Sequence, residues 1–243
     1  MEIDTYLNTA KSKIANKPLK TFILAVLAGI FISLAGILSV VVSISIDNYS
    51  IAKILSALVF PVGLILVILM KTELFTGNSL LVIPLLNKDI KLKELLKNWL
   101  IVYLGNLFGA LLISLLIINT PLKNIIASSF IKITNTKISL NITSAIILGI
   151  LCNFLVCLAV FLASNAKSIG EKVIVIFLPI FTFVALSFEH SVANMSYLSL
   201  GYLLDNSIKI SHILLKNLIP VTIGNIIGGG LLAIIIYYLR KDK

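Results

Sequence analysis

The sequence predicts an all-α integral membrane protein of six transmembrane helices, arranged as a 3+3 inverted repeat with the second and fifth helices broken. Three observations support this. Of the 243 residues, 59% are hydrophobic and only 12% are charged, about half the charged share of a soluble domain. Apolar runs follow one another from Thr21 to Leu239. Short motifs of the first half of the chain recur in the second half at a nearly constant offset.

Four runs without charged residues are long enough to span a bilayer, which takes about 20 residues of helix. They are Thr21–Ile46, Asn98–Leu122, Ile138–Ala166 and Asn217–Leu239. Two further runs are interrupted: Ile54–Met70 and Leu74–Asn87 flank Lys71-Thr72-Glu73, and Val173–Phe188 and Ser191–Leu204 flank Glu189-His190. We therefore expect six crossings, of which the second and fifth are broken.

The motifs that recur define the repeat. Glu73 and Asn78 lie 116 residues before Glu189 and Asn194, and Gly105-Asn106-x-x-Gly109 lies 119 residues before Gly224-Asn225-x-x-Gly228. Each half holds three crossings, and an odd number makes the second copy enter the membrane in the opposite sense. We expect one membrane domain over residues 1–243, with an N-terminal segment (1–20), a first repeat (21–122) and a second repeat (138–239).

The lysines and the single arginine indicate the orientation of the chain. If six spans alternate, thirteen of these cations lie on the side of both termini and six on the other side. Cytoplasmic loops carry an excess of Lys and Arg, so both termini are expected in the cytoplasm of a multi-pass protein of the inner membrane. No cleavable signal peptide is expected, because the first apolar run is too long for one.

Several other classes of function are disfavoured. The net charge of +10 is spread over the ends of the spans, which argues against a nucleic-acid-binding face. Cys152 and Cys157 lie within one apolar run and are interpreted as packing residues, and no group of His and Cys has the spacing of a metal site. We expect neither a metal nor a cofactor.

Two broken helices at equivalent places of inverted repeats indicate a transport site, because unwound backbone is tolerated at membrane depth only inside protein or beside water. Free backbone N–H groups at such breaks favour an anion. Function is therefore expected where the two breaks meet.

At these breaks the sequence resembles the formate/nitrite transporter family, and the resemblance runs from Pro18 to the last span. The matching segments are Glu73-Leu74-Phe75-Thr76-Gly77-Asn78, Asn98-Trp99 with Gly105-Asn106, Cys152 to Cys157, Phe188 to Met195 and Pro220 to Gly229. The resemblance implies a homopentamer of aquaporin-like protomers in the bilayer, each with its own pore for formate, nitrite, hydrosulfide or a related small monovalent anion.

The resemblance also implies roles for particular residues. The family's apolar constriction falls on Phe60, Leu64 and Phe183, with Leu74 and Phe75 beside the second-span break. Thr76 and His190 match its polar pair at the pore centre, Asn153 its pore-side asparagine, and Lys137 its extracytoplasmic vestibule lysine. Lys71-Thr72 departs from the family, which usually carries small or uncharged residues there.

The polar residues at the breaks also have structural interpretations. Glu73 and Glu189 are expected to cap the following half-helices and to face away from an anion pore. Asn106 and Asn225 are expected to form hydrogen bonds between helices, and Asn78 and Asn194 belong to the same structural set. Lys71 could extend to the membrane surface, pair with Glu73 or add positive potential to the cytoplasmic mouth; we favour the pair with Glu73.

Our hypothesis is a channel for small anions, with formate as the first candidate and nitrite and hydrosulfide as alternatives. In it Lys137 concentrates anions, and His190 transiently donates a proton so that a weak acid crosses the apolar rings nearly neutral. The remoter alternatives are a neutral-solute pore and an intramembrane enzyme that uses Glu73, Glu189 and His190 as acid and base. The sequence lacks the Asn-Pro-Ala signature expected of a neutral-solute pore, and it lacks the nucleophile motif or metal site that an enzyme would need.

Overall fold

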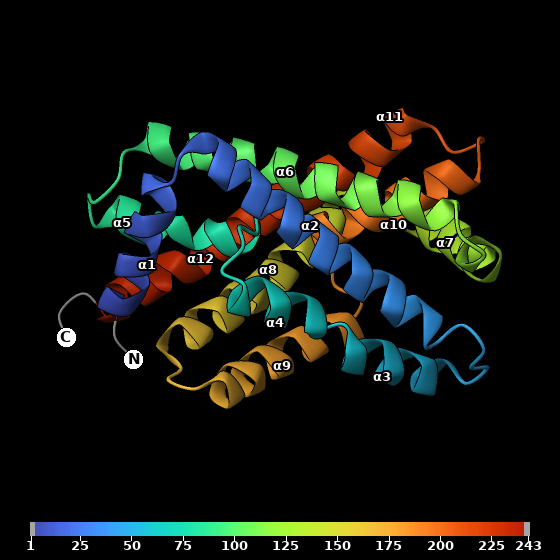
Figure 1. Ribbon diagram of the computed structural model, residues 1–243, viewed down its shortest axis with the longest axis horizontal. Coiled ribbons are helices and arrows are strands. Elements are labelled where there is room, and N and C mark those ends of the chain that lie inside the picture. The colour runs from blue at the N-terminus through green and yellow to red at the C-terminus, as the bar shows by residue number, and fades with distance from the viewer. Residues whose placement is uncertain (1–2, 241–243) are drawn as a thin grey trace.

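Within residues 3–240, which the computed structural model describes, all regular secondary structure is helical (Figure 1). The first half contains α1 (Ile3–Ala15), α2 (Pro18–Val41), α3 (Tyr49–Val59), α4 (Val62–Leu69), the 3-10 helix η1 (Gly77–Leu81), α5 (Val82–Leu86) and α6 (Leu92–Ile118). The second half contains α7 (Leu122–Ile138), α8 (Ile142–Asn165), α9 (Ile169–Ala185), α10 (Ser191–Leu204), α11 (Ile210–His212), the π-helical segment η2 (Ile213–Leu218) and α12 (Ile219–Arg240).

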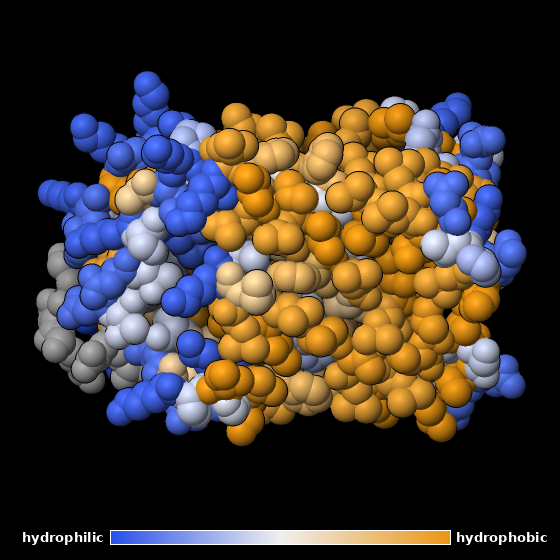
Figure 2. Space-filling view, viewed as in Figure 1, coloured by the Kyte–Doolittle hydropathy of each residue, from blue (hydrophilic) through white to orange (hydrophobic). Residues whose placement is uncertain are grey.

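Five helical stretches of the described chain are long and apolar enough to cross a membrane, one fewer than the six crossings expected. They are Pro18–Val41, Tyr49–Leu69, Leu92–Ile118, Ile142–Asn165 and Ile210–Arg240. The expected fifth crossing falls short because its apolar run is divided, with 17 residues in α9 and 14 in α10. On the face that Figure 2 shows, a broad apolar belt lies between two polar ends, as expected for a protein whose outer surface contacts lipid.

Two pairs of long helices form the centre of the fold. Helix α2 packs along α6, and α8 packs along α12. Both contacts depend on glycine: a Cβ atom at Gly109 would overlap the carbonyl oxygen of Val26, and one at Gly228 would overlap that of Ile150. Small residues at such crossings let two backbones approach closely, which is how membrane helices gain packing energy.

Two helices were not expected from the sequence. The N-terminal segment forms α1, which buries Tyr6, Leu7 and Ala10 against the bundle. Residues 123–137, treated above as a connection between the repeats, belong to α7, which buries Ile126, Phe130 and Thr134. Neither helix is long enough or apolar enough to resemble a span, so the apolar runs of the sequence indicate neither.

Local backbone geometry explains where the two broken helices end. Lys71 and Ser187 both have a left-handed backbone, with φ of 51° and 58°. The next N–H in each case bonds five residues back, Thr72 to Val67 O at 3.0 Å and Phe188 to Phe183 O at 2.9 Å. This is the Schellman arrangement, which ends a helix and satisfies its last carbonyl groups. Non-helical chain follows at residues 70–76 and 186–190.

Candidate functional site

The two interruptions meet at a hydrogen bond between Thr76 and His190. The Thr76 hydroxyl lies 2.8 Å from Nε2 of His190, and both side chains are buried. On the other side of the ring, Nδ1 accepts the backbone N–H of Ala193 at 3.1 Å, so His190 is the N-cap of α10. A nitrogen that accepts a hydrogen bond carries no proton. In the neutral ring the proton therefore lies on Nε2, and Nε2–H donates to the Thr76 hydroxyl.

Asn106 on α6 and Asn225 on α12 hold the unwound backbone with matching sets of bonds. Oδ1 of Asn106 accepts Phe75 N–H at 2.9 Å, while its Nδ2 donates to Glu73 O at 2.9 Å and to Ala25 O at 2.7 Å. Asn225 similarly holds the second break: Oδ1 accepts Ser191 N–H at 2.8 Å, and Nδ2 donates to Glu189 O at 2.9 Å and Gly149 O at 2.8 Å. These amides replace the backbone partners that water would otherwise supply.

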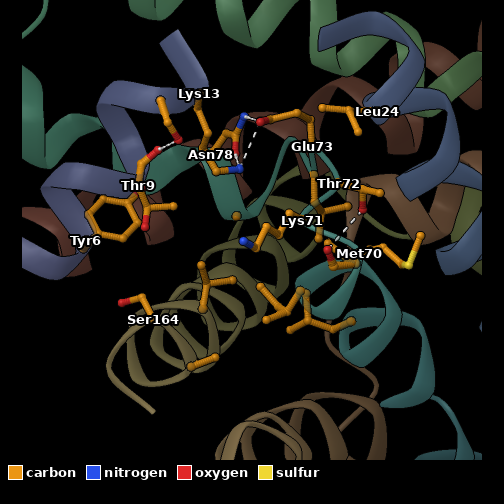
Figure 3. Close-up of a pocket in the computed structure, with 18 of the residues that line it drawn as sticks. Tyr6, Thr9, Lys13, Leu24, Met70, Lys71, Thr72, Glu73, Asn78 and Ser164 are labelled. Atoms are coloured by element: carbon orange, nitrogen blue, oxygen red, sulfur yellow. Dashed lines mark hydrogen bonds and ion pairs between the residues drawn. The ribbon is translucent and has the colours of Figure 1, made fainter. Parts of the chain in front are cut away.

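Glu73 belongs to a buried polar network at the first break (Figure 3). Its Oε2 accepts Lys13 Nζ of α1 at 3.0 Å and Asn78 Nδ2 at 2.6 Å. Asn78 in turn accepts Lys13 at 2.9 Å and donates to Oδ1 of Asn98 on α6 at 2.9 Å. The expected pair between Lys71 and Glu73 is therefore wrong. The left-handed backbone directs Lys71 away, and the docked helix α1 brings Lys13 to the carboxylate instead.

Glu189 forms an equivalent network at the second break. Its Oε1 accepts Lys137 Nζ of α7 at 2.7 Å, and its Oε2 accepts Asn194 Nδ2 at 2.6 Å and Asn217 Nδ2 at 3.1 Å. Asn194 also donates to Oδ1 of Asn217 at 2.8 Å. Lys137 is thus an ion-pair partner of Glu189 as well as a residue of the far-side pocket described below.

These contacts correct the roles expected of the two glutamates. Both carboxylates bond to side chains, and the backbone N–H groups after the breaks are capped by Asn106, Asn225 and His190 instead. Nor do Glu73 and Glu189 face away from the pockets, since each lines one. We expected them to face away because a carboxylate repels an anion, but the lysine beside each carboxylate offsets that repulsion.

Sequence reasoning assigned no role to three members of these networks. Asn98 and Asn217 are 119 residues apart, the same offset as Asn106 and Asn225, so the repeat itself could have identified them. Lys13 gave no such signal, because it approaches Glu73 only through the docking of α1.

Two pockets approach the central pair from opposite ends of the bundle. The terminus-side pocket has a volume of about 580 Å³ and is lined by α1, α4 and the first break, including Lys13, Leu64, Lys71, Glu73 and Leu74 (Figure 3). The far-side pocket has a volume of about 500 Å³ and is lined by Lys53, Phe60, Lys132, Lys137, Phe183, Glu189 and His190.

Apolar side chains lie between these pockets. The rings of Phe60 and Phe183 meet edge to face with centroids 5.6 Å apart, and Phe183 stacks on His190 at 5.8 Å. Leu64 and Leu74 line the terminus-side pocket, whereas Phe60 and Phe183 line the far-side pocket, so Leu64 of the expected constriction lies at a different pocket from the two phenylalanines. Phe75 packs edge to face on Tyr103 with centroids 4.9 Å apart, and also contacts Trp99.

Asn153 on α8 is fully buried behind Thr76. Its Nδ2 donates to Thr76 O at 3.2 Å, to Ser79 Oγ at 3.1 Å and to Asn225 O at 2.6 Å. Cys157 Sγ also lies 3.3 Å from Thr76 O. Asn153 therefore connects the backbone of the first break to α12, which holds the second. Within the described residues, no group of three or more His, Cys, Asp or Glu side chains could hold a metal ion.

Comparison with known proteins gives a consistent result. A family model described as "Formate/nitrite transporter" matches residues 2–239. The chain is 34% identical to the formate channel FocA of Escherichia coli K12 over 98% of this chain and 96% of that protein. It is 35% identical to a probable formate transporter of Methanothermobacter thermautotrophicus over 92% of this chain and 89% of that one.

Solved structures are similar over the same length. One is described as a pentameric formate channel with formate bound, with a TM-score of 0.83 and 32% identity over 93% of this chain and 98% of that chain. Another is described as an FNT family ion channel, with a TM-score of 0.87 and 27% identity over 97% of this chain and 98% of that chain.

Proposed function

The chain belongs to the formate/nitrite transporter family, and we propose that it conducts formate, with nitrite and hydrosulfide as alternative cargoes. Family membership makes it a membrane transporter and not an enzyme. The observation that carries the proposal is the buried Thr76–His190 pair, which lies between two pockets with a net positive lining.

The matched networks at the two breaks support an inverted repeat of residues 21–122 and 138–239. Asn106 and Asn225 each make the same three bonds, and Glu73 and Glu189 each bind one lysine and an asparagine. In this arrangement the interrupted segments α3 to α5 and α9 to α10 each cross the membrane once, giving six crossings in an aquaporin-like protomer.

The charge distribution supports the proposed orientation. Both ends of the described chain lie at the same end of the bundle, as do α1 and α5 (Figure 1). With six alternating spans, thirteen basic residues are expected on this side and six on the other. By the positive-inside rule, the terminus-side pocket faces the cytoplasm of an inner-membrane protein. The far-side pocket then faces outward.

Exposed apolar side chains and the pentameric formate channel of similar structure support assembly as a homopentamer. Each protomer would keep its own pore, because the two pockets and the central pair are built from a single chain.

The proposed mechanism has two parts. First, Phe60, Phe183, Leu64 and Leu74 strip water from the ion, which excludes hydrated and bulky ions. Second, the Thr76 hydroxyl accepts Nε2–H of His190, so its own proton is free to donate to a formate oxygen. This donor compensates in part for the lost hydration of the ion.

Neutralisation of formate by the ring requires one more step. A ring that releases a proton and remains neutral must first be protonated on both nitrogens. In that form Nδ1 has no lone pair for the N–H of Ala193, with which it bonds in this structure. The proton-donation hypothesis therefore includes a temporary loss of the α10 cap during transport.

The test is a flux measurement on the purified protein in proteoliposomes. Labelled formate should enter faster than into protein-free liposomes, and unlabelled nitrite, hydrosulfide, acetate and lactate should compete according to their use of the same path. Entry of glycerol without entry of any of these anions would contradict an anion channel. Preference for hydrosulfide or nitrite over formate would replace the proposed cargo.

A further inference from the structure

The terminus-side pocket carries more positive charge than its ion pair explains. Its lining contains four lysines, Lys13, Lys20, Lys71 and Lys172, and a single carboxylate, Glu73. Lys13 and Glu73 form an ion pair with each other. Among the described residues, the other three lysines form no ion pair. Three positive charges are therefore left around a cavity of about 580 Å³, which is much larger than formate.

Lys71 is the most unusual of these lysines. It occupies the left-handed position of the Schellman motif that ends α4, with φ of 51°, where glycine is preferred because it has no Cβ. A lysine here costs conformational free energy that a glycine would not, and strained positions of this kind tend to occur at functional sites. The equivalent residue of the second break, 116 positions later, is the uncharged Ser187.

The direction of the side chain fits a role in the pocket. The turn itself is held by its backbone, because Lys71 N–H bonds to Ile68 O at 3.2 Å and Thr72 N–H to Val67 O at 3.0 Å. Figure 3 shows Lys71 extending away from Glu73 into the space between the break and helix α8, which carries Ser164. The side chain is exposed, so its charge acts on the contents of the pocket.

We propose that Lys71, supported by Lys20 and Lys172, recruits anions at the cytoplasmic mouth and sets how fast they enter the apolar path from that pocket. This inference rests on the proposed function. Positive charge in a cleft raises the local concentration of anions, and salt weakens the effect. One charge several ångströms from an anion changes its concentration by about three-fold at low salt.

A passive channel does not reveal by its net flux direction on which side a charge acts. At low concentration the permeability is the same in both directions, so removing Lys71 slows entry and exit alike. Salt added on one side of the membrane screens only the charges exposed on that side. The side on which added salt slows the flux is therefore the side on which the charge acts. Inverted membrane vesicles expose the cytoplasmic mouth to the bath, and right-side-out vesicles expose the other mouth.

The measurement is exchange of labelled formate while the bath is changed from about 0.01 M to about 1 M of an impermeant salt at constant osmolarity, which shortens the Debye length from ~30 Å to ~3 Å. The ratio of the two rates within one preparation does not depend on how much protein was inserted. In inverted vesicles, the wild type should slow by about three-fold more than Lys71→Gln. In right-side-out vesicles, the two proteins should respond equally.

Three further variants separate charge from folding. Lys71→Arg should retain the salt response. Lys71→Gly should lose it while unfolding at the same or a higher temperature, because it also removes the strained Cβ. Lys88→Gln is the matched control: Lys88 is exposed at the end of α5 on the same side, has φ of 62°, and does not line the pocket. Its response should equal that of the wild type.

Two results would overturn the inference and leave the proposed function standing: a full salt response of Lys71→Gln in inverted vesicles, or an equal loss of response in both vesicle types. Absence of any anion flux in wild-type vesicles would overturn the proposed function, and this inference with it. Exchange of another small anion in place of formate would correct the cargo only, and the same ratios measured with that anion would decide the role of Lys71.

Discussion

Substitution of Asn225 by alanine should strongly destabilise the second break. The side chain is fully buried and makes three hydrogen bonds of 2.8 to 2.9 Å to the backbone of Ser191, Glu189 and Gly149. Between membrane helices such a bond is worth about 0.6 to 2 kcal/mol, and a buried group left without a partner costs about 1 to 3 kcal/mol. Three lost bonds sum to a decrease of about 2 to 6 kcal/mol in the free energy of unfolding.

The assay is denaturant unfolding of the purified protein in mixed micelles, with Asn119→Ala as the matched control. Asn119 also donates its amide to a backbone carbonyl, that of Leu115 at 2.8 Å, but at an exposed helix end, so its loss should cost less than about 0.5 kcal/mol. Asn106→Ala should behave like Asn225→Ala. Equal, small costs for Asn225→Ala and Asn119→Ala would refute the idea that these amides hold the unwound backbone.

Three other predictions concern separate parts of the molecule. Lys137→Met should lower the free energy of unfolding by about 3 kcal/mol because it leaves the buried charge of Glu189 without a partner. The second substitution Glu189→Gln should recover much of this stability; a double-mutant unfolding cycle with no coupling would contradict this. Thr76→Val should lower formate flux in proteoliposomes by about ten-fold or more, because the desolvated ion loses one hydrogen-bond donor. Thr76→Ser should retain most of the flux; equal rates for Thr76→Val and the wild type would exclude a role of the hydroxyl in conduction. The pKa of Asp89 is lowered, first by its hydrogen bond from Asn87 and then by Lys11. Its contact with α1 should therefore be present at neutral pH and weaken as the pH falls through the lowered pKa, seen as lower protection factors of the α1 amides in hydrogen exchange; protection factors unaffected by this titration would contradict it.

Much of the fold follows from local sequence signals. The long apolar runs match α2, α6, α8 and α12 closely, because their length and lack of charge suit a bilayer span. The interruptions fall where Lys71 to Glu73 and Glu189-His190 divide apolar runs. The amphipathic helices α1 and α7 could not be found this way, because their burial depends on tertiary docking.

The candidate site was less accessible to sequence reasoning. The central Thr76 and His190 were identified through family resemblance, and the structure places them in contact. The partners of Glu73 and Glu189 depend on long-range approach: Lys13 lies 60 residues before Glu73, and Lys137 lies 52 before Glu189. The tautomer of His190 likewise depends on an N–H contributed by the following helix, which no residue pattern specifies.

The central claim is that small anions pass between the two breaks beside His190. The chain contains two histidines, and His212 is exposed outside this path, so it offers a matched control. Formate uptake into proteoliposomes should be measured at about pH 5 and pH 7, on either side of the ordinary histidine pKa, for wild type, His190→Asn and His212→Asn. We predict that His212→Asn matches the wild type and that His190→Asn loses the pH dependence. Wild-type rates and pH dependence in His190→Asn would contradict the account.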